Sequence, residues 1–135
     1  MPNAILTRRE IFCAAHRLLN TKLSDEENFK LFDKCFNANG HGHNYMVEVS
    51  VRGPIDDNGL VMNLTTLKDI MDEHIMSKVD HKHLNLDVPE FATLNPTVEN
   101  IAVTCWNWLK PALGNLLHEV TIYETDKNFA AYHGD

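Results

Sequence analysis

The sequence predicts an α+β fold, in which an antiparallel four-stranded sheet carries two main helices on one face. Three observations lead to this prediction. From Tyr45 to Arg52 every second residue is Tyr or Val, a period of two that indicates a strand with one buried face. Apolar residues recur at helical spacing from Leu64 to Ile75 and again from Ile101 to Leu109. No repeat, low-complexity tract or linker interrupts the chain, so we expect one domain over residues 1–135.

The predicted elements follow one another as strand, short helix, strand, two helices and two closing strands. The first strand covers Ala4 to Arg17, where β-branched, aromatic and small residues predominate, and His16 lies near its end. Ser24 is followed three residues later by Glu27, and this capping box opens a short helix through Phe32.

The middle of the chain is divided by turn and cap residues. Residues 53–59 are rich in Gly, Pro, Asp and Asn and are predicted to turn. Residues 60–62 resemble a strand ending, and the helix that follows is capped by Asn63 or Thr65. Residues 80–83 are expected to form a loop, where site residues often lie.

The last helix and the closing strands have equally clear boundaries. Thr97 is the predicted cap of that helix, and Pro111 and Gly114 are expected to close it. The closing strands are predicted at residues 116–125 and 129–132.

Net charge and cysteine content limit the classes of function that the protein can have. Nineteen acidic against twelve basic residues give a net charge of −7, which opposes binding to nucleic acid and provides no basic patch for a membrane surface. We therefore expect a small-molecule substrate. Cys13, Cys35 and Cys105 lack Cys-x-x-Cys spacing and are expected to be reduced thiols. Nothing in the first ten residues suggests export, so a cytoplasmic location is expected.

Three histidines form a candidate metal site. In a strand, His41 and His43 project to the same face, and Gly40 and Gly42 beside them allow close approach of backbone or ligand. With His16 they would offer three imidazoles, a set that suits zinc and leaves a fourth position open for chemistry. The other histidines are expected to be surface or packing residues: His74, His83, His118 and His133.

Other residues are candidates for acid–base chemistry and substrate binding. Cys35 becomes a usable base if a metal or imidazolium lowers its pKa. Asp80 can fix the tautomer of the adjacent His81. Glu124 lies in an apolar strand and should have a partner, and its carboxylate suits the amidine-like edge of a guanidine or pterin. Glu99 can complement a helix dipole.

Several motifs, in order and nearly end to end, resemble the 6-pyruvoyl-tetrahydropterin synthase family, and most of all its eukaryotic-type members. The long stretch between Cys35 and His41 carries the eukaryotic likeness. Cys13 departs from the family pattern, since many relatives carry Ser there. The motifs are Phe12–Leu18, Cys35–Tyr45, Gly59–Asn63, Asp80–Asn85 and Tyr123–Thr125.

The resemblance implies specific roles for the candidate residues. It implies a zinc ion on His16, His41 and His43, and Cys35 as the general base. The pair Asp80–His81 would assist Cys35 from a neighbouring subunit. The resemblance also implies a tunnelling fold, whose sheets join into a barrel in a trimer, with two trimers forming a homohexamer.

The resemblance further implies the substrate, 7,8-dihydroneopterin triphosphate, and the reaction, a lyase reaction that releases triphosphate in tetrahydrobiopterin biosynthesis. Glu124 would hold the pterin ring, with Thr97 and Glu99 at neighbouring substrate contacts. Because the substrate is strongly anionic and the chain is acidic, local basic residues must offset the repulsion. The basic residues nearest to these motifs are Arg17, Lys34 and Lys82.

Three alternatives remain at this point. The weakest is a zinc hydrolase that uses bound hydroxide, because the sequence has no His-Glu-x-x-His motif to supply its carboxylate base. A 6-carboxy-tetrahydropterin synthase of deazapurine biosynthesis would share the zinc, thiol and Asp-His parts, although the long spacing from Cys35 to His41 opposes it. A structural zinc-binding module would need a fourth protein ligand and no role for Cys35.

Overall fold

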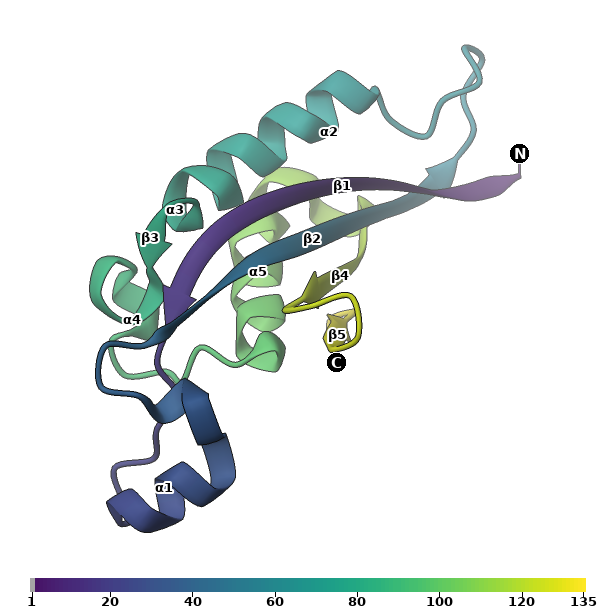
Figure 1. The fold of residues 1–135 in the computed structure, drawn as a ribbon. Helices are drawn as coiled ribbons and strands as arrows, with labels where there is room; N and C mark the ends of the chain where they lie inside the picture. The colour runs from purple at the N-terminus through teal and green to yellow at the C-terminus, as the bar shows by residue number, and fades with distance from the viewer. Residues whose placement is uncertain (1) are drawn as a thin grey trace.

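Residues 2–135 are described by a computed structural model, in which a curved sheet carries its main helices on one face (Figure 1). The strand order in the sheet is β3-β1-β2-β4-β5. The two longest strands, β1 and β2, form an antiparallel ribbon that runs the length of the molecule. The strands are β1 (Asn3–His16), β2 (His41–Pro54), β3 (Lys82–His83), β4 (Leu117–Tyr123) and β5 (Phe129–Tyr132).

The α+β prediction is confirmed, but the count of four strands is wrong by one. Lys82 and His83 form β3, which pairs in parallel with Ala14 and Ala15 of β1. Two residues are too few for a period of two to show in sequence, so this segment was predicted as loop. Residues 60–62 add no strand, and the chain bends there before the next helix.

The helices surround one side of the ribbon. Along one edge, α2 continues through a π-helical segment into α3, while α5 packs beside β4 and β5 (Figure 1). None of the helices in residues 2–135 has the length and hydropathy to cross a membrane. The helical segments are α1 (Asp25–Phe32), η1 (Asp33–Phe36, 3₁₀), α2 (Leu64–Met71), η2 (Asp72–Met76, π), α3 (Ser77–Val79), α4 (Leu84–Asp87), η3 (Pro89–Phe91, 3₁₀), α5 (Val98–Leu113) and η4 (Gly114–Leu116, 3₁₀).

The caps follow the sequence closely. Ser24 and Glu27 form the expected capping box, Asn63 rather than Thr65 caps α2, and Thr97 caps α5. Pro111 does not end α5, because it lies inside the last turn and the helix continues to Leu113 before its Gly114 cap.

The core lies between the ribbon and the helices. Tyr45, Val47, Val49 and Val51 of β2 are fully buried, as their alternation predicted. Full burial of an apolar side chain of this size stabilises a fold by about 1.5–3 kcal/mol. The core residues of the helices that face them are Leu67, Met71, Ile75, Ile101 and Leu109.

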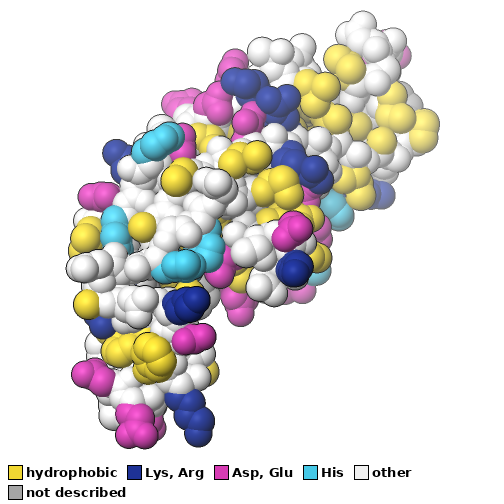
Figure 2. Space-filling view, viewed as in Figure 1, with side chains coloured by type: hydrophobic (Ala, Val, Ile, Leu, Met, Phe, Trp, Pro, Cys, Tyr) yellow, Lys and Arg dark blue, Asp and Glu magenta, His cyan; other side chains and the backbone are white. Residues whose placement is uncertain are grey.

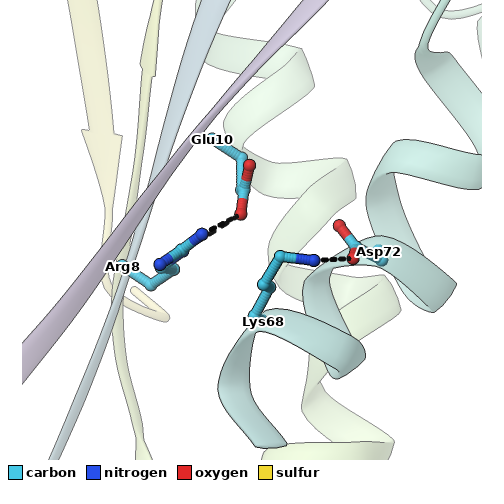
Figure 3. A network of polar contacts seen from close by, with 4 residues as sticks. All are labelled: Arg8, Glu10, Lys68 and Asp72. Atoms are coloured by element: carbon cyan, nitrogen blue, oxygen red, sulfur yellow. Dashed lines mark hydrogen bonds and ion pairs between the residues drawn. The ribbon is translucent and has the colours of Figure 1, made fainter. Parts of the chain in front are cut away.

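Polar residues occur at two places along this face of β1. Toward the amino terminus, Arg8 and Glu10 form an ion pair beside a second pair, Lys68 with Asp72 from the adjoining helix (Figure 3). Toward the carboxyl end of β1 the face ends at His16, which is completely buried.

Candidate metal centre and active site

The pairing of β1 with β2 brings the histidines together. His16 lies directly opposite His41, and Ala14 lies opposite His43. Opposite residues of an antiparallel pair project to the same face, and so do residues two apart in one strand. The His41 and His43 rings have centroids 4.5 Å apart, and those of His16 and His43 are 5.1 Å apart. The structure thus gathers all three predicted zinc ligands at one end of the buried face.

A set of four groups has the spacing that a metal ion needs. One ligand-type atom from each of His16, Cys35, His43 and Glu124 lies within 4.8 Å of the others. His41 lies against His43 but outside this set, so its place as a ligand stays a prediction. The set mixes nitrogen, sulfur and oxygen donors, all of which zinc accepts.

Unmatched nitrogens support a metal in this position. Among residues 2–135, Nε2 of His16 and Nε2 of His43 are buried without a hydrogen-bond partner. Nε2 of His43 is 3.3 Å from Oε1 of Glu124, a contact without hydrogen-bond geometry. Buried polar atoms without partners cost free energy, and a bound cation would remove that cost. The residues therefore fit a metal ion.

The other ring nitrogen of His16 is held by two neighbours. Nδ1 lies 2.9 Å from the carbonyl oxygen of Pro96 and 3.0 Å from the hydroxyl oxygen of Tyr45. Because a carbonyl can only accept, we assign the proton to Nδ1, which donates to Pro96. This tautomer leaves the lone pair of Nε2 directed into the site. Histidines that bind metals commonly donate their other ring N–H to a backbone carbonyl in the same way. Sequence reasoning missed both contacts, because Tyr45 was interpreted as a core residue of a strand and Pro96 lies outside the motifs.

Cys35 is held beside the histidines by its backbone. It lies in η1, and its carbonyl oxygen accepts a 2.7 Å hydrogen bond from the amide of Leu18, just after β1. Burial raises the pKa of the Cys35 thiol, and the negative charges of Glu124 and Asp33 raise it further. Without a cation nearby, the thiol therefore stays protonated at neutral pH.

Burial also shapes the charge of the histidines. It lowers the pKa of His16, against the opposing effects of the Pro96 hydrogen bond and the Glu124 charge. Burial likewise lowers the pKa of His43, which Glu124 partly offsets. Both imidazoles are thus neutral at pH 7, the form that binds metal ions.

Gly40 is required by the close packing around His16. Its φ is +83°, and a Cβ there would lie 2.8 Å from the His16 carbonyl oxygen and 2.9 Å from Nε2 of His83. Gly42 has no such constraint, since its nearest neighbour would be 3.8 Å away. His83, expected to be a surface or packing residue, therefore lies next to the site. Only the parallel pairing of β3 with β1 reveals this.

Asp80 and His81 lie beside β1 at Cys13, whose carbonyl oxygen accepts a 2.7 Å hydrogen bond from the amide of His81. Oδ1 of Asp80 accepts a 3.0 Å hydrogen bond from the amide of Cys13 and lies 3.1 Å from Nδ1 of His81. The predicted carboxylate–imidazole pair is therefore present. The His81 side chain is 82% exposed and its φ is +60°, so the imidazole is presented to solvent.

The remaining predicted substrate contacts lie at the start of α5. Thr97 directly follows the Pro96 carbonyl that holds His16, and its hydroxyl accepts from the amide of Asn100. Glu99 is exposed in the first turn. Their roles as substrate contacts stay predictions.

Comparison with known proteins identifies the family. A family model described as 6-pyruvoyl tetrahydropterin synthase matches residues 5–135. The chain belongs to this family. The 6-pyruvoyl tetrahydrobiopterin synthase of Homo sapiens is 52% identical over 134 residues, which cover 98% of this chain and 92% of that protein. The Dictyostelium discoideum protein of the same name is 49% identical and covers 97% and 96%.

A solved structure agrees with the sequence comparison. The Caenorhabditis elegans 6-pyruvoyl tetrahydropterin synthase has a TM-score of 0.93 and 44% identity, covering all of this chain and 98% of that one. The resemblance noted from the motifs is thereby confirmed, and the family is one of lyases. The pterin class of substrate follows from the same family membership.

Proposed function

We propose that this protein is a zinc-dependent lyase that converts 7,8-dihydroneopterin triphosphate to 6-pyruvoyl-tetrahydropterin and triphosphate. The observation that carries the proposal is the convergence of His16, His43, Cys35 and Glu124 within 4.8 Å. A base, a metal site and a carboxylate for the pterin thus lie side by side. The reaction breaks one carbon–oxygen bond, and triphosphate leaves with the electron pair. Hydrogens move from the side chain to the N5=C6 bond of the pterin ring, so the oxidation of the side chain balances the reduction of the ring and no external oxidant or reductant is needed.

His16, His41 and His43 would hold the zinc ion, with the Nε2 of His16 already directed into the site. Bound there, zinc supplies a positive charge that polarises the side-chain oxygens of the substrate and lowers the pKa of the nearby thiol. Cys35 then removes a proton from the side-chain carbon. The tie from Leu18 to the Cys35 carbonyl keeps the thiol in place for this step.

Glu124 would hold the pterin ring by accepting two parallel hydrogen bonds from its amidine-like edge. Its present neighbour is His43, at 3.3 Å, so the carboxylate would turn from the imidazole to the pterin when substrate binds. Thr97 and Glu99 would contribute neighbouring contacts from the start of α5.

We also propose that the active site is completed by another subunit of a homohexamer. The support is the 82% exposure of the His81 side chain, compared with the complete burial of His16. An imidazole ordered by Asp80 yet directed to solvent is suited to serve the thiol of a neighbouring copy. His81 would relay protons to and from Cys35, a contribution of about 10²–10⁴ in rate.

Turnover of 7,8-dihydroneopterin triphosphate by zinc-loaded protein tests the proposal. We expect triphosphate and 6-pyruvoyl-tetrahydropterin as products, and loss of both in a Cys35→Ala variant that keeps its zinc. A 6-carboxy product would instead support the deazapurine alternative. Zinc bound equally by both proteins with turnover in neither would favour a structural zinc module.

A further inference from the structure

A cavity of about 360 Å³ lies beside the metal centre, where β1 ends. Its polar lining consists of Arg17, Asn39, His83 and Asn85, and small apolar side chains line the rest. No Asp or Glu is among the described residues that line it. This volume falls within the range of about 300–1,000 Å³ that is typical of small-ligand pockets. In an acidic protein, a pocket with one Arg and no carboxylate in its lining favours an anion over a cation.

Arg17 is held so that its outer edge stays available. Its Nε donates to the carbonyl oxygen of Phe36 at 3.1 Å, and its guanidinium carbon lies 4.6 Å from the centre of the Phe36 ring. Within residues 2–135, its Nη atoms form no hydrogen bond or ion pair. Two Nη groups on a fixed plane match the geometry of a phosphate.

His83 adds a second group to this pocket. Its Nδ1 is buried and has no hydrogen-bond partner in the described chain, while its Nε2 lies against Gly40. Asn85 is occupied in a different way, because its amide bonds the backbone N–H and C=O of Arg17 at 2.7 and 2.9 Å. Asn85 therefore fixes the backbone of Arg17, and Nδ1 of His83 has no partner but reaches a ligand in the cavity only when the ring turns. Figure 2 shows histidine side chains gathered near the end of β1, with a basic side chain beside them.

The order of these groups across the sheet matches the order of parts in the proposed substrate. Glu124 follows β4, His43 lies in β2, His16 ends β1 and His83 lies in β3, and these strands are neighbours in that sequence. Four adjacent strands span about 14 Å at a spacing of about 4.8 Å. The substrate has its pterin at one end, a three-carbon side chain in the middle and the triphosphate at the other end.

We infer that Arg17 and His83 form the binding subsite for the triphosphate of the substrate, an inference that rests on the proposed function. With the pterin at Glu124 and the side chain at the histidines, the triphosphate reaches the cavity on the β3 side. A larger adjoining cavity of about 540 Å³ has no charged side chain among the described residues that line it. It offers no comparable site for an anion.

Binding of inorganic triphosphate to zinc-loaded protein tests the subsite. Calorimetry should show about 10- to 100-fold weaker binding in Arg17→Met, because charge-assisted hydrogen bonds are lost. His83→Gln should weaken binding less, by a few fold. Arg52→Met is the matched control, since Arg52 is exposed on β2 and far along the ribbon from the cavity. Zinc content is measured before and after each titration, because triphosphate also chelates zinc.

A second ligand separates binding from structural support. Dihydroneopterin, which has no phosphate, should bind Arg17→Met as well as the original protein. An equal loss for both ligands would mean that Arg17 acts by holding the Cys35 loop through Phe36, and would overturn the subsite. Unchanged triphosphate affinity in Arg17→Met would overturn it as well, whether the anion sits on the zinc or elsewhere.

The experiments distinguish a failure of the triphosphate subsite from a failure of the proposed lyase function. Triphosphate binding that depends on Arg17, in a protein that does not turn over the pterin, would leave an anion site and refute the lyase reaction. Turnover with triphosphate binding unaffected by Arg17→Met or His83→Gln would keep the lyase and refute the subsite.

Discussion

Two polar clusters lie on the same face of β1, one near the middle of the strand and one at its carboxyl end, and only one of them resembles a site. The ion-pair cluster consists of Arg8, Glu10, Lys68 and Asp72 (Figure 3). The histidine cluster consists of His16, Cys35, His43 and Glu124. Both are polar, both border the apolar core, and both combine residues distant in sequence.

The two clusters differ in how many of their polar atoms have a hydrogen-bond or ion-pair partner within the cluster. In the ion-pair cluster two cations meet two carboxylates, with nitrogen–oxygen distances of 2.8 Å in each pair. In the histidine cluster two imidazole nitrogens have no partner in the described chain, and a thiol and a carboxylate add further acceptors. Acceptors without donors attract a cation. Unsatisfied polar atoms, more than polarity itself, mark the functional end of the face.

The largest effect is expected from His43→Ala. This change removes a nitrogen from the centre of the histidine cluster, so zinc binding and turnover should both be lost. Zinc content by mass spectrometry and a turnover assay measure the two. Retention of stoichiometric zinc in His43→Ala would show that the cluster is not the metal centre.

Cys35→Ala should separate chemistry from metal binding. We expect turnover to fall by about 10²–10⁴, as for loss of a general base, with zinc retained. The buried Cys105 provides the matched thiol, so Cys105→Ala should keep its turnover per folded molecule. Equal turnover in Cys35→Ala and the original protein would remove Cys35 from the mechanism.

Tyr45→Phe tests the contact that orients His16. The ring and its stacking on Phe12 are kept while the hydroxyl beside Nδ1 is lost. Loss of a contact that orients a metal-binding histidine weakens metal affinity by about 10- to 100-fold. Competition with a chelator measures the affinity, and Tyr132→Phe, near the carboxyl terminus, is the control. An unchanged affinity would mean that Pro96 alone orients the ring.

Acid should destabilise the metal-free protein through the histidine cluster. Burial lowers the pKa of His16 and of His43 in the folded state, so below about pH 6.5 the unfolded chain takes up protons that the folded chain does not. Stability should therefore fall as the pH drops from 7 to 5.5, by at most about 1.4 kcal/mol per pH unit for each group. Urea unfolding at both pH values measures it.

The smallest effect is expected in the ion-pair cluster. Lys68→Met breaks the pair with Asp72, in which both side chains are 44% exposed, and exposed pairs contribute about 0–1 kcal/mol. Zinc affinity and turnover should not change. A loss of zinc in this variant would mean that the ion-pair cluster and the histidine cluster are coupled, which would contradict the distinction drawn between them.

Local pattern was a reliable guide wherever a few neighbouring residues decide the structure. The alternation in β2 and the caps Ser24, Asn63 and Thr97 agree with the structure, because each depends on contacts within one turn or one strand. The two-residue strand β3 was missed for the opposite reason. Its pairing with β1 joins residues 68 positions apart, and two residues carry no periodicity.

The sequence by itself determined the α+β class, the family motifs and the candidates His16, His41, His43 and Cys35, since these depend on residue type and spacing. Only the tertiary structure decided which atoms meet. The register of β1 with β2 places the histidines together, and the turn of η1 adds the thiol. The tie of His16 to Pro96, across 80 residues, and the place of His83 beside Gly40 arise from packing that no local pattern records.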